Sequence, residues 1–197
     1  MKTSSKNNPP GFRRDVLPLH IEPFQSEAMT SSRFGFECKW PNPFIIYTRS
    51  KLWDKALLIS ANIERENETQ VARYELYEGG MSFIHPIRKL QTDASHAGII
   101  LGRAMSQDLV VPVASISNAH VAFIPPQKKN NKWMVMDLGS RNSTWLGEVQ
   151  LPVREPKAIK DDNYLRLGGN LIAWFFSTGR MWELLRDPIA LRRYTEI

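Results

Sequence analysis

The most informative part of this 197-residue chain reads Asp137-Leu138-Gly139-Ser140-Arg141-Asn142-Ser143-Thr144-Trp145. Aspartate, glycine, serine and asparagine gather here in one short segment, and each of these residue types favours tight turns. The segment follows a run of strand-forming residues at 133–136. It precedes a predicted hairpin in which Gly147 and Glu148 join 145–146 to 149–150, and glycine in the first turn position suits a type II′ turn. We therefore predict a polar loop that connects two strands.

Two further polar pieces lie upstream, each at one end of a predicted strand. They are Gly102-Arg103 and Ser117-Asn118-Ala119-His120. Taken alone, Arg103 has the ordinary role of a solvated loop cation, Ser117 that of a capping hydroxyl and His120 that of a buried structural histidine. Asn142 has the ordinary role of a turn residue, because asparagine tolerates a positive φ. The order and spacing of the pieces carry more information than any one residue.

In this order and spacing the pieces resemble the forkhead-associated (FHA) domain, a phosphopeptide-recognition fold. The family pattern runs Gly-Arg, then Ser-x-x-His, then Asp-x-Gly-Ser-x-Asn-Gly-Thr. Here Gln107-Asp108-Leu109 stands where the family often has Asn-Asp-Ile, and residues 161–168 are similar to its closing Gly-Asp-x-Ile-x-Leu-Gly element. The resemblance covers residues 98–176. It implies an all-β fold, an FHA-type antiparallel β-sandwich.

The resemblance also implies a site for phosphothreonine, which carries about −1.5 to −2 charge and three strong acceptor oxygens. Arg103 and Ser117 would bind the phosphate, because a planar guanidinium makes paired charge-assisted bonds and a hydroxyl adds a donor. Asn118 and Asn142 would bind the main chain of an extended peptide. Four further residues would support the geometry of the site: Gly102, His120, Gly139 and Thr144.

Two positions depart from the family pattern. Ser143 stands where the family has glycine, and a serine at positive φ pays a steric cost that glycine avoids. We therefore expect a turn of another form that aims Asn142 differently. Asn118 stands where many members carry arginine or lysine, so one phosphate-binding cation is missing. We expect the site to be mostly intact.

Three regions follow from the rest of the chain: an irregular leader at 1–33, a sandwich at 34–178 and a helical segment at 179–197. The segment from residue 34 is rich in strand-forming residues, among them Phe36, Trp40 and residues 44–47. We expect further strands at 71–77 and 81–87. Downstream strands are expected at 98–101, 109–113, 120–124, 133–136, 164–167 and 171–176. Many short strands without helical patterns between them favour a sandwich over a parallel α/β sheet. Residues 180–194 have the apolar spacing of a short C-terminal helix, which Pro188 would kink or divide.

Composition narrows the function classes. The net charge is +6, and residues 1–14, which hold four basic and no acidic residues, contribute +4 of it. No dense basic run with interleaved aromatics exists elsewhere, so nucleic-acid binding is not expected. The densest apolar run, 171–176, is too short to cross a membrane, and no secretory signal is apparent. Cys38 is the single cysteine, which excludes an internal disulfide and suits the reducing cytoplasm.

An enzyme is the first alternative. The four histidines have no paired metal-ligand spacing, and the chain carries neither a phosphate-binding P-loop nor a Gly-x-Ser-x-Gly elbow. We therefore predict no catalytic residue, no metal and no cofactor.

The sequence as a whole predicts a cytoplasmic signalling adaptor that acts downstream of Ser/Thr kinases. Its partner would be a phosphothreonine-containing protein, such as a Ser/Thr kinase or a substrate of one, with no membrane insertion. The remaining alternative is a phosphate-independent interaction or scaffold module that uses the sandwich surface or the C-terminal helix. Trp182, Leu184 and Leu185 are the residues that support this alternative.

Overall fold

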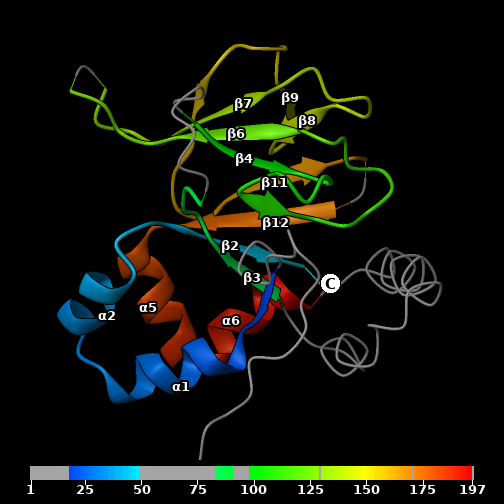
Figure 1. Cartoon of the computed structure of the whole chain (residues 1–197). Helices are drawn as coiled ribbons and strands as arrows, with labels where there is room; N and C mark the ends of the chain where they lie inside the picture. The colour runs from blue at the N-terminus through cyan, green and yellow to red at the C-terminus, as the bar shows by residue number, and fades with distance from the viewer. Residues whose placement is uncertain (1–17, 49–82, 91–97, 129, 170, 197) are drawn as a thin grey trace, which may run out of the picture.

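The computed structural model describes residues 18–48, 83–90, 98–128, 130–169 and 171–196. Two β-sheets face each other in the upper part of Figure 1, and a layer of helices lies below the larger sheet. The strand expected at 71–77 lies outside the described residues.

The larger sheet has seven strands in the order β1-β3-β2-β12-β11-β8-β9, all antiparallel. Its strands are β1 (Leu19–His20), β2 (Phe44–Tyr47), β3 (Phe83–Pro86), β8 (Thr144–Leu146), β9 (Val149–Gln150), β11 (Asn163–Leu167) and β12 (Leu171–Phe176). The predicted hairpin is present, because Trp145 pairs with Gln150 and Leu146 pairs with Val149. Gly147 in its turn has a φ of 59°, as a type II′ turn requires.

The smaller sheet has five strands in the order β10-β7-β6-β4-β5. Its strands are β4 (Ile99–Gly102), β5 (Leu109–Val110), β6 (Val121–Ile124), β7 (Met134–Asp137) and β10 (Lys157–Ala158). The two sheets confirm the predicted β-sandwich. One pair departs from the antiparallel expectation, because the short β5 runs parallel to β4.

The sandwich core lies between the sheets and follows the two-residue alternation of the strands. In β11, Leu165 and Leu167 are buried in this core, whereas Arg166 between them is only half-buried on the outer face. The same alternation places Ala173 and Phe175 of β12 inside. The strand residues that point into the space between the two sheets are therefore the apolar ones.

The four helices of the described residues form a third layer on the outer face of the larger sheet (Figure 1). They are α1 (Glu22–Thr30), α2 (Arg33–Lys39), α5 (Thr178–Arg186) and α6 (Pro188–Thr195). Strand β2 is buried on both faces, since Ile45 and Tyr47 join the sandwich core while Phe44 and Ile46 join the helical core. A strand that is covered on both faces has apolar residues at consecutive positions of its sequence. None of the described helices is long and apolar enough to span a membrane.

The N-terminal helices correct two sequence expectations. Helix α1 lies inside the stretch predicted to be an irregular leader, and Phe36, expected to favour a strand, is buried in α2. Helix α2 begins after Ser32, whose side chain accepts a hydrogen bond from the backbone N–H of Gly35. A serine in this role starts a helix, although in the sequence it suggested only a polar loop. The buried residues of α1 are Phe24 and Ala28, which are too few to give a helical pattern in the sequence.

The C-terminal helical prediction is confirmed, and Pro188 divides the segment into α5 and α6. The side chain of Asp187 caps α6 by accepting hydrogen bonds from the backbone N–H groups of Ile189 and Ala190. Leu184 and Leu185 are buried in the helical core. These two side chains, which supported the helix-based alternative, therefore hold the fold together.

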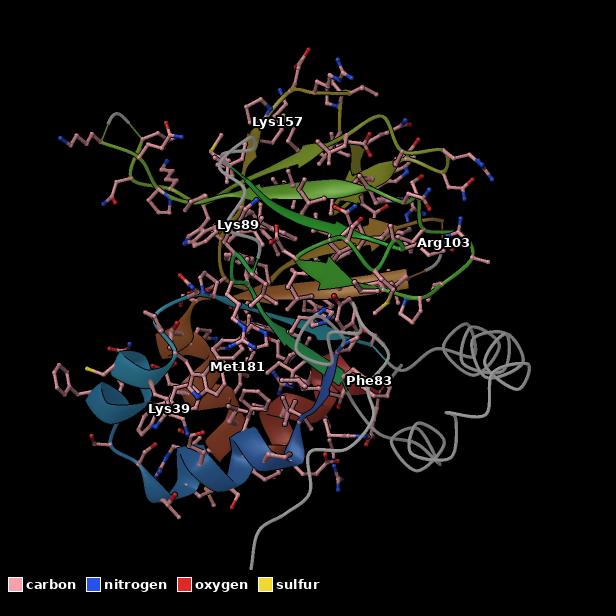
Figure 2. The ribbon with its side chains drawn as sticks, in the orientation of Figure 1. Lys39, Phe83, Lys89, Arg103, Lys157 and Met181 are labelled. Carbon is pink, nitrogen blue, oxygen red and sulfur yellow. The ribbon has the colours of Figure 1, made fainter. Side chains whose placement is uncertain are left out.

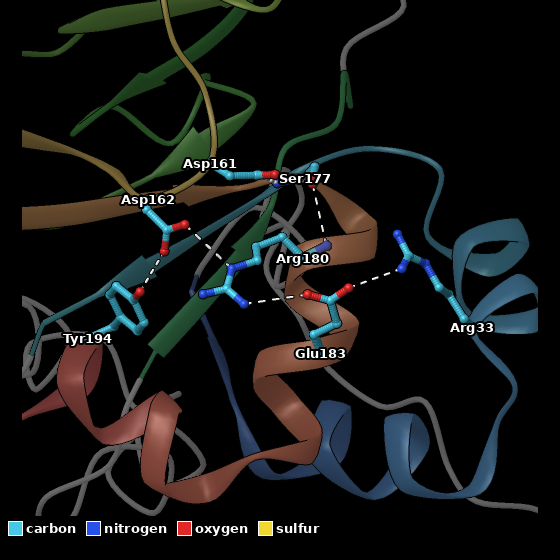
Figure 3. A network of polar contacts seen from close by, with 7 residues as sticks. All are labelled: Arg33, Asp161, Asp162, Ser177, Arg180, Glu183 and Tyr194. Atoms are coloured by element: carbon cyan, nitrogen blue, oxygen red, sulfur yellow. Dashed lines mark hydrogen bonds and ion pairs between the residues drawn. The ribbon is translucent and has the colours of Figure 1, made fainter.

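A polar network joins the helices to the sandwich (Figure 3). Asp161, in the turn before β11, accepts hydrogen bonds from the backbone N–H and the hydroxyl of Ser177, which caps α5. The adjacent carboxylate of Asp162 lies 3.5 Å from Nε of Arg180 and accepts a 2.5 Å hydrogen bond from the Tyr194 hydroxyl. These contacts attach α5 and α6 to the turn that precedes β11 in the larger sheet.

Candidate functional site

The three polar pieces of the sequence meet at one end of the smaller sheet. Strands β4, β6 and β7 are neighbours in that sheet, where Leu101 pairs with Val121 and Val121 pairs with Asp137. The loops that follow β4, precede β6 and follow β7 therefore emerge side by side. Figure 2 shows Arg103 at this end, and Lys89 and Lys157 at the other.

Gly102 and Arg103 connect the first two loops. A Cβ on Gly102 would lie 2.1 Å from the carbonyl oxygen of Asn118, so only glycine fits there. The backbone N–H of Arg103 donates to the carbonyl of Ser117 at 2.8 Å, and its Nε donates to the carbonyl of Ile116 at 3.2 Å. One terminal guanidinium nitrogen also donates to Oδ1 of Asn118 at 3.4 Å. The exposed guanidinium is thus held across the loop that contains Ser117 and Asn118.

His120 braces the second loop against the third. Its Nδ1 accepts a 3.0 Å hydrogen bond from the backbone N–H of Ser117, and its Nε2 lies 3.3 Å from the carbonyl oxygen of Ser143. Because Nδ1 accepts, the ring proton is on Nε2 and is donated to that carbonyl. Burial lowers the pKa of His120, although Ser143 and Asp137 oppose the shift. A neutral ring is the form that can make both contacts.

Two more hydrogen bonds join the recognition loop, residues 137–144, to the second loop. The backbone N–H of Arg141 donates to Oγ of Ser117 at 3.0 Å, and Nδ2 of Asn142 donates to the carbonyl of Ser115 at 2.8 Å. The structure therefore brings Arg103, Ser117, Asn118 and Asn142 together.

Arg141 is a site residue that the sequence reasoning missed. It is exposed, and its backbone is bonded to Ser117. It occupies an unspecified position of the family pattern, and the signal that could have found it is its place directly before Asn142. Its hydrogen bond to Ser117 places the backbone of a second basic residue next to the loop that Arg103 contacts.

The side chain of Asp137 accepts hydrogen bonds from several residues of the recognition loop. Its Oδ1 accepts hydrogen bonds from the backbone N–H groups of Gly139 and Ser140, at 2.8 and 2.9 Å. Its Oδ2 accepts from the hydroxyls of Ser140 and Thr144, each at 2.6 Å. Burial by itself would raise the pKa of Asp137, but these four hydrogen bonds together lower it. Gly139 has a φ of 83°, and Thr144 is fully buried.

Asp108 is a second residue whose role the sequence did not reveal. Its side chain is buried, and its two carboxylate oxygens accept hydrogen bonds from the backbone N–H groups of Leu90 and Ile100. Lys89 lies 3.4 Å from the same carboxylate. Asp108 thereby ties the loop after Arg103 to the start of β4.

Ser143 has a φ of 59°, in the left-handed region that favours glycine. The expectation of a turn of another form was therefore wrong. The carbonyl of Ser143 accepts from His120, and its Oγ accepts a 3.0 Å hydrogen bond from Nε2 of Gln150. These contacts hold the serine in a conformation that costs it energy.

Replacing Ser143 with glycine should raise the free energy of unfolding by about 0.5–1 kcal/mol. Glycine removes the strain of the positive φ, and this gain exceeds the loss of the exposed hydrogen bond to Gln150. Urea denaturation of the two proteins measures the difference, with Gln150→Ala as the control for the lost hydrogen bond. A less stable S143G protein would show that the strain is not the dominant contribution.

His120 should make stability depend on pH. Its folded pKa lies below the ordinary value of 6.5, so its contribution is fully present above that pH. The contribution declines as the pH falls below about 6.5 and is lost through the lower folded pKa, where His120 must be protonated. Urea denaturation at pH 7 and pH 5 should therefore show a larger loss for the wild type than for His120→Asn. Equal losses in the two proteins would contradict this role.

Comparison with known proteins finds one family match, which spans the loops described above. Residues 99–168 match the model of the FHA domain family. This match confirms the resemblance drawn from the sequence, which covered residues 98–176. No curated protein matches the chain.

Three solved structures illustrate the similarity. The MEK1 FHA domain in complex with a HOP1 phosphothreonine peptide has 23% identity, covers 48% of this chain and 87% of its own, and has a TM-score of 0.38. An FHA domain from Arabidopsis thaliana has 23% identity, covers 41% and 66%, and has a TM-score of 0.37. An FHA domain from Chlamydia trachomatis has 13% identity, covers 69% and 98%, and has a TM-score of 0.42.

Proposed function

We propose that the chain is a phosphothreonine-binding adaptor module that recognises an extended phosphorylated segment of a partner protein. The observation that carries the proposal is the arrangement of four side chains at one end of the smaller sheet. The exposed guanidinium of Arg103 lies across the loop of Ser117 and Asn118, and Asn142 is bonded to that same loop. This is a concentrated set of donors for an anion on a rigid scaffold.

The phosphate would be held by Arg103 and Ser117. Arg103 presents its guanidinium edge for paired bonds to two phosphate oxygens. The Ser117 oxygen already accepts from the N–H of Arg141, so its own hydroxyl proton can be donated outward. The side chain of Arg141 adds positive charge beside the two, because its backbone is bonded to Ser117.

The peptide main chain would be held by the two asparagines. Oδ1 of Asn118 accepts from Arg103, so its Nδ2 donors are the groups that can meet a peptide carbonyl. Asn142 is bonded in the opposite sense, because its Nδ2 donates to Ser115 and its Oδ1 is left to accept a peptide N–H. One donor and one acceptor on either side of the phosphate suit an extended chain, which offers both.

The proposal extends to the partner and the setting. The ligand would be a phosphothreonine made by a Ser/Thr kinase, on the kinase or on one of its substrates, in the cytoplasm. The module would bind without catalysing a reaction. A few charge-assisted hydrogen bonds of about 1.5–3 kcal/mol each, set against the ordering of a flexible peptide, predict affinity in the micromolar range.

A titration of the protein against degenerate peptide libraries tests the proposal. One library is built around phosphothreonine, a second around phosphoserine and a third around unphosphorylated threonine. Saturable binding to the phosphothreonine library, weaker binding to phosphoserine and none to threonine would support the function. Equal binding to phosphorylated and unphosphorylated libraries would instead favour the phosphate-independent module.

A further inference from the structure

Part of the outer face of the larger sheet carries no helix among the described residues. The helical core reaches Trp174 of β12, whose ring contacts Tyr194 of α6 with centroids 5.0 Å apart. Beyond it, Ile172 pairs with Arg166, Arg166 with Trp145, and Trp145 with Gln150. Directly paired residues of an antiparallel sheet project from the same face. These four residues therefore form one cross-strand row, here called the Trp145 row.

The Trp145 row has the composition of a protein-binding surface. The guanidinium carbon of Arg166 lies 4.4 Å from the centre of the Trp145 ring, and both side chains are half-buried. The ring orients the arginine through a cation–π contact. In the described parts of the chain, no acidic side chain forms an ion pair with Arg166. Tryptophan and arginine are the residues most enriched where binding energy concentrates.

The turn between β8 and β9 contains an acidic residue, Glu148. Glu148 accepts a hydrogen bond from the hydroxyl of Tyr164, which raises the pKa of that tyrosine, while the nearby Arg166 lowers it. The carboxylate of Glu148 is therefore already engaged by Tyr164. Arg166 is left as the charge that the Trp145 row presents to a ligand.

The Trp145 row is continuous with the recognition loop. Trp145 directly follows Thr144, the last residue of that loop. On strand β9, Nε2 of Gln150 donates a hydrogen bond to Oγ of Ser143. Ser143 directly follows Asn142 in the chain. A peptide bound by Asn142 would therefore lie next to the start of the Trp145 row. The site contributes the basic residues Arg103 and Arg141, and the row contributes the basic residue Arg166.

We propose that the Trp145 row is a second contact surface for the phosphorylated partner, and that it binds an acidic and apolar segment flanking the phosphothreonine. This inference rests on the proposed phosphothreonine binding. A carboxylate of the segment would pair with Arg166, and an apolar side chain would pack on Trp145 and Ile172. Continuity with the recognition loop and complementary charge favour this occupant over an unrelated protein.

Selection from long phosphopeptides tests this inference. The probe is a library with phosphothreonine fixed at the centre and ten degenerate positions on each side. The wild type should enrich aspartate and glutamate, by roughly threefold or more, at a fixed distance from the phosphothreonine. Arg166→Glu should reverse the preference to lysine and arginine at that distance while binding still requires the phosphate. Lys157→Glu, at the other end of the sandwich in Figure 2, makes the same charge change and should select like the wild type.

The outcomes separate this inference from the function on which it rests. Phosphothreonine-dependent selection with the same flanking residues for wild type and R166E would overturn the second contact surface alone. A folded wild type that selects no phosphothreonine peptide would overturn both. A dimer of the peptide-free protein that R166E dissociates would assign the row to a second copy of the chain, and would also overturn the inference.

Discussion

Arg103→Ala is expected to weaken binding of a phosphothreonine peptide by at least about 100-fold, because it removes the cation that is held across the Ser117 loop. Two charge-assisted hydrogen bonds to phosphate contribute about 3 kcal/mol or more together, which corresponds to a factor of that size. Isothermal titration calorimetry with one selected peptide measures the change.

Two companion variants make the Arg103 result specific. Arg103→Lys keeps the charge but loses the planar fork, so its affinity should lie between those of the wild type and the alanine variant. Arg192→Ala removes an exposed arginine of α6 and should bind like the wild type. Wild-type affinity in a folded R103A protein would show that phosphate is bound elsewhere.

Asp137→Asn should lower the free energy of unfolding by about 2–4 kcal/mol. The carboxylate accepts four hydrogen bonds, two on each oxygen, and the buried Thr144 hydroxyl is one of the donors. An asparagine has an oxygen on only one side, so whichever way the amide faces, one pair of donors loses its acceptor. Leaving a buried donor such as the Thr144 hydroxyl unpaired costs more than its hydrogen bond contributes.

A matched control for this loss is Asp187→Asn. Asp187 also accepts two backbone hydrogen bonds, but it is an exposed helix cap, where asparagine is as good as aspartate. Urea denaturation should therefore show a large loss for D137N and almost none for D187N. If both variants unfold at the same urea concentration as the wild type, the recognition loop does not depend on the Asp137 carboxylate.

Acid unfolding should report the same carboxylate. The pKa of Asp137 is lowered in the folded protein, so its stabilising contribution is present above the ordinary value of 3.8 and is lost as the pH falls below it. This window lies well below that of His120, and the two contributions can be separated by pH alone.

The local parts of the site could be predicted from the sequence. Gly102, His120 and Gly139 act through backbone geometry and neighbouring loops, and their residue types report that directly. The register of the 145–150 hairpin followed from Gly147, and the break between α5 and α6 followed from Pro188. In each case one residue carries the conformational constraint.

The rest depended on packing between distant segments. Helix α1 is stabilised by the burial of Phe24 and Ala28 in the helical core. The sequence of α1 alone does not show that these two residues have a partner layer to pack against. The backbone of Ser143 could not be predicted either, since His120 and Gln150 hold it in place across the fold. The backbone N–H of Arg141 bonds Ser117 across 24 positions of the chain, a contact that the sequence does not show.

The most direct test of phosphate recognition is a backbone amide NMR titration with a phosphothreonine peptide and its unphosphorylated twin. The phosphorylated peptide should shift the amides of Arg103, Ser117, Arg141 and Asn142, while the unphosphorylated peptide leaves them in place. Shifts confined to α5 and α6, or the same shifts with both peptides, would contradict a phosphothreonine site at the end of the smaller sheet.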